Sequence, residues 1–170
     1  MRLLEAADDN LRRSRLRIPG PPICRSASTC KTCQGPRQEA SEVATNKEVV
    51  EAAYASFARG DVPAVLGAVA DDIQWTEADG YPLAGTYVGP QAVLEGVFMR
   101  LGEIGDEFAV VPHQIVAEGD TVVALGNASW KHKDSGAPAV VKMAHVWTVA
   151  DGKLATFQQH IDTVRVRELS

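Results

Sequence analysis

The 170-residue sequence has little that points to a membrane or to a nucleic acid. It contains no apolar run near the ~20 residues of a membrane-spanning helix, and its N-terminal segment has no apolar stretch like that of a secretory signal. Acidic residues outnumber basic ones, 22 to 17, whereas phosphate binding needs a dense basic surface. We therefore expect a cytoplasmic protein with no membrane or nucleic-acid partner.

Cysteine is scarce as well, and it is confined to the segment "CRSASTCKTC". Cys30 and Cys33 have the spacing of a zinc-ligand pair and Cys24 is a possible third ligand, but no fourth ligand lies nearby. Phosphate-binding glycine loops, the G-x-S-x-G motif of serine hydrolases and metal-ligand histidine spacings are also absent. The sequence therefore favours free thiols, no cofactor and no metal, and it leaves no cysteine nucleophile beyond Cys33.

Composition divides the chain near residue 45. Residues 1–44 are rich in arginine and proline and hold all three cysteines, which predicts a disordered basic tail. Residues 45–170 are acidic and strongly patterned. The apolar content of 45% is enough for one sizeable core. We therefore expect one folded domain after a tail.

Two periodicities follow one another in the domain. Apolar spacing near 3.6 residues predicts helices over 45–60, 61–72 and 90–101. Alternation with period two predicts strands over 73–77, 108–117, 121–133, 139–149 and 154–164. Helices followed by an antiparallel meander indicate an α+β fold rather than a doubly wound parallel sheet.

The alternation also predicts which side chains face the helices. Lys142 marks one face of strand 139–149 as the outer face, which places His145 and Trp147 on the inner face. In strand 121–133 the same reasoning places Trp130 and His132 inside, although His132 lies near a hairpin end, where exposure is favoured. Together with His160 of the last strand, three histidines and two tryptophans are therefore expected to line one concave surface.

Two further features of the strands bear on the pocket. Gly126 lies inside a strand, where glycine often marks a bulge that bends the sheet. The last strand has two alternatives that the pattern does not separate: one face carries Ala155, Phe157, Gln159 and Ile161, and the other carries Thr156, Gln158, His160 and Asp162.

Three stretches together resemble the SnoaL-like branch of the nuclear transport factor 2-like (NTF2-like) superfamily: "VVEAAYASFARGDVPAVLGAVADDIQWTE", "GTYVGPQAVLEGVF" and "KMAHVWTVADGKLATFQQHIDT". This superfamily includes ketosteroid isomerases, polyketide cyclases, limonene-epoxide hydrolases and scytalone dehydratase. The resemblance runs from about Thr45 to the C-terminus. It implies a cone-shaped, curved antiparallel sheet wrapped around N-terminal helices, a pocket in the open end, and a homodimer formed through the outer sheet face.

The resemblance transfers catalytic roles only in part. The general-base aspartate of ketosteroid isomerases corresponds to Glu77, a carboxylate one methylene longer. Their oxyanion-hole tyrosine corresponds to Ala53, and the adjacent Tyr54 is expected to point about 100° away. Asp162 would be the neutral acid of that arrangement only if the last strand turns its face inward.

The candidate site has two groups of residues. Candidate catalytic residues are Glu77, His145, His160 and Asp162, with Asp162 orienting the imidazole of His160. Candidate ligand-binding residues are Tyr54, Phe57, Trp75, Tyr87, Trp130, His132, Trp147 and Gln158. The structural alternatives are a solvated strand-end carboxylate for Glu77 and a core histidine bonded to a neighbouring strand for His145.

Three functions stay open on this pattern. The first is a cofactor-independent isomerase or lyase in which Glu77, with a pKa raised toward neutrality, removes a proton next to the carbonyl of a small hydrophobic ketone or polyketide. The second is a module that binds a small hydrophobic ligand without chemistry. The third is a dimerisation domain, which would have an exposed Glu77 and a cone filled by Trp75, Trp130 and Trp147.

Overall fold

The computed structural model describes residues 44–169. The first helix, α1 (Asn46–Ala58), begins at a capping box in which the Thr45 hydroxyl accepts from the Glu48 backbone N–H and the Glu48 carboxylate accepts from the Thr45 backbone N–H. This satisfies two of the backbone groups that a helix start leaves open. The predicted tail, with its three cysteines, lies outside the described residues. No helix within the described range is long and apolar enough to cross a membrane.

Six strands form one curved sheet in the order β2-β1-β6-β5-β4-β3. Their bounds are β1 Val69–Glu77, β2 Gly85–Val88, β3 Asp106–Glu118, β4 Thr121–Lys131, β5 Pro138–Ala150 and β6 Lys153–Ile161. Strands β3 to β6 form the predicted antiparallel meander, and β1 pairs with β2 in the same sense. The β1–β6 pair is parallel, so the sheet is mixed rather than wholly antiparallel.

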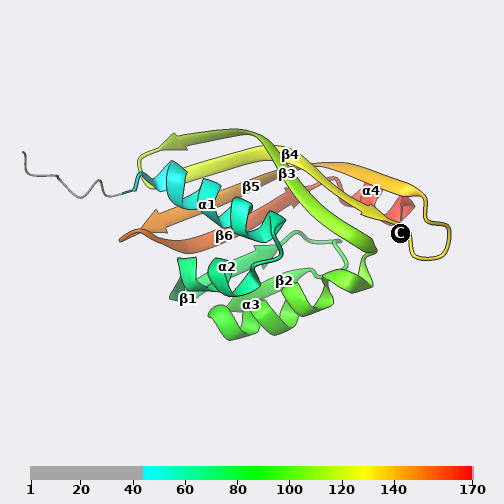
Figure 1. The fold of residues 1–170 in the computed structure, drawn as a ribbon, viewed down its shortest axis with the longest axis horizontal. Coiled ribbons are helices and arrows are strands. Elements are labelled where there is room, and N and C mark those ends of the chain that lie inside the picture. Colours follow the sequence, from blue (N-terminus) through cyan, green and yellow to red (C-terminus); the bar gives the residue numbers. More distant parts are fainter. Residues whose placement is uncertain (1–43, 170) are drawn as a thin grey trace, which may run out of the picture. The chain divides into compact units, whose positions relative to one another are not determined.

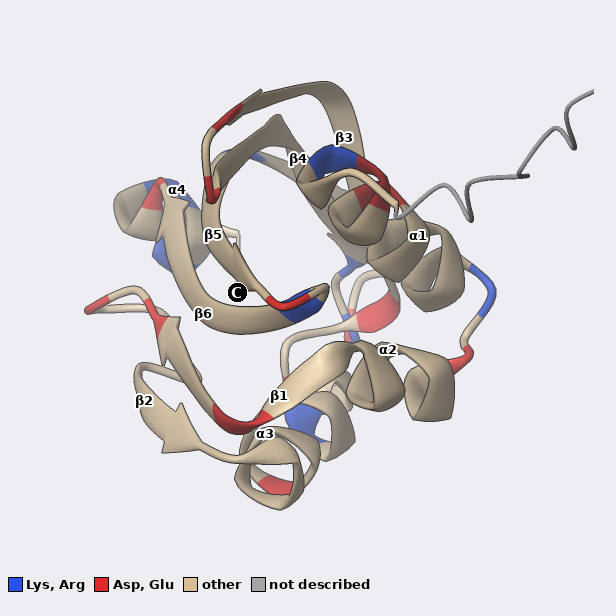
Figure 2. Cartoon of the chain, turned by 90° about the vertical axis from the view of Figure 1, so that its left-hand side faces the viewer, with Lys and Arg blue, Asp and Glu red and all other residues tan. Residues whose placement is uncertain are grey.

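The helices cover the concave face of this sheet. Helix α1 lies along strands β3 to β6, and Figure 2 shows the sheet curving with α1 and α2 (Val62–Ala68) on its inner side. The buried residues of α1 are Val50, Ala53 and Tyr54. They pack into the same core as the inward residues of β4 and β5, which alternate buried and exposed as the sequence predicts. Helix α1 lies over these strands (Figure 1). The fold is therefore α+β, with helices on one face of the sheet.

The segment around residue 70 differs from the prediction. Helix α2 ends at Ala68, and Asp71 and Asp72 lie in β1 rather than at the end of the helix. Both aspartates are exposed, and they fall where the pairing of β1 with β6 is irregular, between Val69 and Gln74. The local sequence pattern is the same for the end of an apolar helix and for the start of a strand. Only the pairing with β6 therefore shows where α2 ends and β1 begins.

Three other elements also differ from the predicted pattern. Strand β2 was not predicted, because an exposed edge strand of four residues shows little alternation. The third helix is shorter than predicted: α3 (Pro90–Gly96) is followed by a 3₁₀ helix, η1 (Phe98–Glu103). A final helix, α4 (Thr163–Glu168), follows β6, where the sequence suggested that the strand continues. The Asp162 carboxylate caps α4 by accepting from the Arg165 backbone N–H at 3.0 Å.

The bend predicted at Gly126 is present. Opposite this glycine the pairing of β3 with β4 shifts between Pro112 and Gln114, so the extra residue belongs to β3. A Cβ at Gly126 would collide with the Val111 carbonyl and lie 2.7 Å from Pro112 Cα. The absence of a side chain therefore allows the two strands to approach closely at the bulge.

The outer face of β3, β4 and β5 carries several exposed large apolar side chains: Val111, Val116, Leu125 and Val140. A homodimer through this face stays a prediction.

Candidate functional site

An aromatic-lined cavity lies between the helices and the concave face of the sheet. Its volume is about 60 Å³, counted as the space open to the centre of a water molecule. Aromatic rings line it from α1, β1, η1, β3, β5 and β6: Tyr54, Phe57, Trp75, Phe98, Phe108, Trp147 and Phe157. The same wall also holds Glu77 and His145. The dimerisation hypothesis required an exposed Glu77 and a filled cone, and neither expectation is met.

Glu77 is the last residue of β1, and its side chain is 3% exposed. Trp75 lies two residues earlier on the same face of the strand, and its indole Nε1 donates to Glu77 Oε1 at 2.7 Å. The second carboxyl oxygen, Oε2, is buried without a hydrogen-bond partner among residues 44–169. Burial therefore raises the pKa of Glu77 to about 7, an effect that the Trp75 bond partly offsets. Near neutral pH the group can both give and take a proton.

A second polar cluster, formed by Tyr54, His145 and Trp147, lies on the same cavity wall. The Trp147 Nε1 donates to the Tyr54 hydroxyl oxygen at 3.1 Å, and that oxygen lies 2.8 Å from His145 Nδ1. Burial lowers the pKa of His145 to about 3 and raises that of Tyr54, so both side chains are neutral at ordinary pH. This cluster places neutral hydrogen-bonding groups in the cavity and adds no charge.

The tautomer of His145 decides what the cluster can offer to a ligand. With Nδ1 unprotonated, the Tyr54 hydroxyl donates to the imidazole. With Nδ1 protonated, the imidazole donates to the hydroxyl oxygen, which also accepts from Trp147, and the phenolic hydrogen is then free to reach a ligand oxygen. The second tautomer gives the arrangement that would stabilise a developing negative charge on oxygen.

Tyr54, one of the candidate ligand-binding residues, lies on the cavity wall although its side chain points about 100° away from that of Ala53 on the helix. Both Ala53 and Tyr54 are buried and line the cavity. The sheet curves far enough around α1 that the helix buries a wide stripe, and two neighbouring positions both fall within it. The tyrosine of this site is therefore Tyr54, beside the position that the resemblance indicated.

The inner face of β6 carries Phe157 and Gln159, which settles the alternative that the sequence left open. His160, Gln158 and Asp162 are exposed, so the candidate roles of His160, Gln158 and Asp162 in the cavity are wrong. The reason is the pairing: Phe157 lies opposite Trp147 on β5, beyond a register shift next to Thr148. Asp162 acts instead as the cap of α4.

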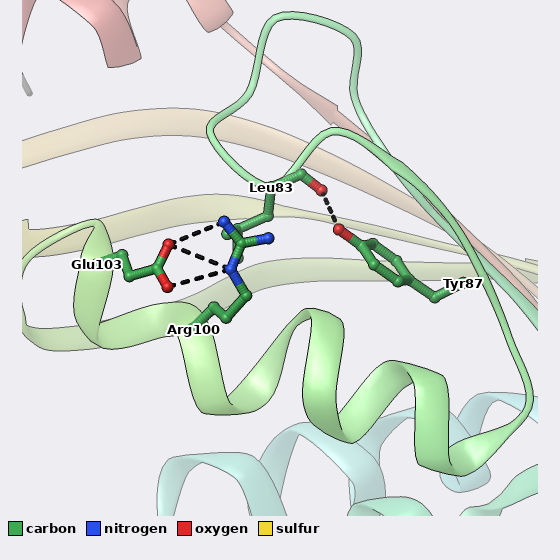
Figure 3. Close-up of polar contacts among 4 residues, drawn as sticks. All are labelled: Leu83, Tyr87, Arg100 and Glu103. Atoms are coloured by element: carbon green, nitrogen blue, oxygen red, sulfur yellow. Dashed lines mark hydrogen bonds and ion pairs between the residues drawn. The ribbon is translucent and has the colours of Figure 1, made fainter.

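Three other predicted ligand-binding residues also lie away from the cavity. Trp130 is buried, but it stacks against Phe108 behind the lining. His132 lies in the hairpin after β4, where its Nδ1 accepts from the Asp134 backbone N–H at 3.3 Å. Tyr87 belongs to the edge strand β2, and its hydroxyl donates to the Leu83 carbonyl at 2.9 Å (Figure 3). Trp130 is held by its stacking on Phe108, His132 lies beyond the end of β4 at Lys131, and Tyr87 lies on the strand at the edge of the sheet.

Two polar residues of the wall were not among the predicted site residues. Gln159 is buried, and its Oε1 accepts from the Ala78 backbone N–H at 3.3 Å, which ties β6 to the end of β1. Tyr81 lies in the loop after β1, and burial together with the nearby charge of Glu77 raises its pKa. Gln159 shares its parity with Phe157, a signal that could have identified it. Tyr81 lies in a loop without periodicity, so the sequence offered no comparable signal.

No group of three histidine, cysteine, aspartate or glutamate side chains suited to a metal ion occurs in residues 44–169.

The comparisons with solved structures place this architecture among NTF2-like proteins. An NTF2-like protein from Burkholderia thailandensis is 35% identical, with 74% of this chain and 97% of that chain covered and a TM-score of 0.70. TerC, co-crystallised with polyporic acid, is 28% identical over 73% of this chain and 96% of its own, with a TM-score of 0.67. No protein of curated function matches the sequence significantly.

A third structure shows the fold alone. It is a protein with a ketosteroid isomerase-like fold from Catenulispora acidiphila in complex with trimethylamine, 19% identical over 74% of this chain and 94% of that chain, with a TM-score of 0.64. The model of the SnoaL-like domain family matches residues 50–157, which is more than half of the chain. The chain therefore belongs to the SnoaL-like domain family, with an NTF2-like, ketosteroid isomerase-like fold.

Proposed function

We propose that the cavity binds a small, largely apolar carbonyl compound and that Glu77 moves a proton at the carbon next to the carbonyl. The protein would then be a cofactor-independent isomerase or lyase. The observation that carries this proposal is the buried carboxylate of Glu77, which lines an aromatic cavity with one oxygen unpartnered among the described residues. A pKa of about 7 suits a base that works near neutral pH.

The proposed step needs only this chain's side chains and the ligand. The Glu77 carboxylate takes the proton, the electron pair of the C–H bond moves into a new carbon–carbon double bond, and the carbonyl oxygen gains the negative charge. Tyr54, in the tautomeric state in which its hydrogen is free, would donate to that oxygen. Glu77 then returns the proton to the same carbon or to another one, or the enolate expels a leaving group.

The cavity volume limits the size of the ligand. One water molecule needs about 10–15 Å³ of such space, so about 60 Å³ accommodates roughly four to six atoms other than hydrogen. The enclosed part of a ligand is therefore a small carbonyl fragment rather than a fused ring system. TerC was co-crystallised with an organic compound, polyporic acid, which supports an organic ligand for this chain as well.

The test is deuterium exchange at the carbon next to the carbonyl of butan-2-one, followed by NMR in D₂O at pD 7.5. We expect the parent to accelerate the exchange and Glu77→Gln to reduce that acceleration at least about 100-fold, the lower range for loss of a general base. Glu118→Gln, which removes an exposed carboxylate at the end of β3, is the matched control and should behave like the parent. Equal exchange in the parent and Glu77→Gln would remove Glu77 from the reaction.

Binding without chemistry is the second candidate function. It is favoured by the hydrogen bonds that already engage the Tyr54 hydroxyl, because in one tautomer that group has no hydrogen to offer a ligand. In that case butan-2-one would stabilise the native protein by mass action and show no accelerated exchange.

Tyr54→Phe tests the polar cluster through stability. Phenylalanine keeps the ring but leaves Trp147 Nε1 and His145 Nδ1 without their shared partner, which we expect to lower the free energy of unfolding by about 1–3 kcal/mol. Tyr87→Phe is the matched control, since it removes the hydrogen bond to the Leu83 carbonyl, outside the cavity, and should cost only about 1 kcal/mol. Urea unfolding measures both. Equal losses in the two variants would contradict a special role for the cluster.

A further inference from the structure

The cavity has one ionisable acid and no basic counterpart. Glu77 lines it, whereas no lysine or arginine of the described part of the chain does. The other titratable groups on its wall are Tyr54 from α1, Tyr81 from the loop after β1 and His145 from β5. All three are neutral near pH 7, because burial raises the pKa of both tyrosines and lowers that of the histidine. An ionised Glu77 would therefore lack a counter-charge.

Aromatic rings line the same space. The Trp75 ring lies with its centroid 5.4 Å from that of Trp147, 5.6 Å from that of Phe98 and 4.0 Å from that of Phe157. Trp75 is also the residue that donates to Glu77 Oε1. The negative faces of such rings attract organic cations, and tryptophan does so most strongly. The Glu77 carboxylate and these rings therefore line one cavity.

We infer that this cavity binds a small alkylammonium ion, with the positive nitrogen against the Glu77 carboxylate and the alkyl groups against Trp75 and Trp147. The bound cation supplies the counter-charge that the protein lacks, and its hydrocarbon surface replaces water in an apolar enclosure. An ion with four or five atoms other than hydrogen matches the enclosed volume. This ligand class goes beyond the proposed function and does not depend on any proton transfer.

The test compares two probes of equal size by isothermal titration calorimetry at pH 8 and constant ionic strength. Tetramethylammonium carries the charge, and tert-butanol is its neutral counterpart. We expect the parent to bind tetramethylammonium at least tenfold more tightly than Glu77→Gln does, with tert-butanol bound equally by both. Glu118→Gln is the control for loss of an exposed acid and should match the parent. Glu77→Asp, which keeps the charge, should retain part of the preference.

The pH dependence of binding to the parent protein tests the inference without any variant. Tetramethylammonium affinity of the parent should fall about tenfold for each unit below the pKa of Glu77, while tert-butanol affinity stays constant. No preference for the cation over tert-butanol, or a preference that survives in a folded Glu77→Gln, would overturn the inference. The exchange of butan-2-one is measured separately, so accelerated exchange without cation binding would reject this inference and leave the proposed function standing.

Discussion

The free energy of unfolding of Glu77→Gln, compared with that of the parent, should rise by about 3 kcal/mol between pH 4 and pH 8. Burial raises the pKa of Glu77 from 4.5 to about 7 in the folded protein. Between these values the folded state keeps a proton that the unfolded chain has lost, so the parent loses stability as the pH rises through this interval. Glutamine does not titrate, so the free energy of unfolding of the variant does not fall for this reason as the pH rises.

His145 changes the free energy of unfolding with pH in the opposite direction to Glu77. The shape of the curve of stability against pH therefore distinguishes the two residues. Burial lowers the pKa of His145 from 6.5 to about 3, so the unfolded chain binds a proton in this interval that the folded protein does not. Its contribution to stability is thus lost as the pH falls below about 6.5. In the parent the two residues nearly cancel between about pH 4.5 and 6.5. In Glu77→Gln the histidine acts alone, and stability should fall steadily on acidification.

Urea unfolding at several pH values measures both curves. The difference between the parent and Glu77→Gln isolates Glu77, since all other titrating groups are common to the two proteins. Glu118→Gln, which removes an exposed carboxylate, is the matched control for the substitution. Parallel curves for the parent and Glu77→Gln would show that Glu77 titrates as in water and would remove the main support for the proposed function.

The second large effect is expected at Gly126. Alanine there would bring its Cβ into the Val111 carbonyl and to 2.7 Å from Pro112 Cα, both of them backbone atoms of β3. These atoms cannot move away without opening the β3–β4 pairing at the bulge. We therefore expect Gly126→Ala to lower the free energy of unfolding by about 3 kcal/mol or more, in the range of severe overpacking.

Gly67→Ala is the matched control for this substitution. Gly67 lies in α2, and a Cβ at that position would meet no described atom within 4 Å. Alanine is the better helix former by about 1 kcal/mol, so this variant should be neutral or slightly more stable. Urea unfolding of both variants decides the matter. A loss below 1 kcal/mol in Gly126→Ala would mean that the bulge adjusts easily and that the curvature of the sheet does not depend on this glycine.

The two predictions concern one architecture. The bulge opposite Gly126 belongs to the curvature with which the sheet surrounds α1, and that curvature encloses the cavity in which Glu77 is buried. A flatter sheet would expose Glu77 to water, and its pKa would return toward 4.5. The shape of the sheet and the acidity of one side chain are therefore linked.

Local signals in the sequence determined most of the architecture. The capping residues of α1, the inward parity of His145 and Trp147 and the glycine at the bulge follow from periodicity and from backbone chemistry, which need no knowledge of distant residues. The inward position of Glu77 belongs to the same group, because it shares its strand parity with Trp75. These features are properties of short stretches of chain.

Only the tertiary structure decided the remaining parts of the site. The inward face of β6 depends on a register shift against β5, and the position of Tyr54 depends on how far the sheet wraps around α1. Tyr81 reaches the wall from a loop without periodicity. In each case the deciding contact joins residues far apart in the chain. Local sequence patterns reflect interactions between neighbouring residues only. The inward face of β6 and the positions of Tyr54 and Tyr81 were decided by packing between residues far apart in the chain.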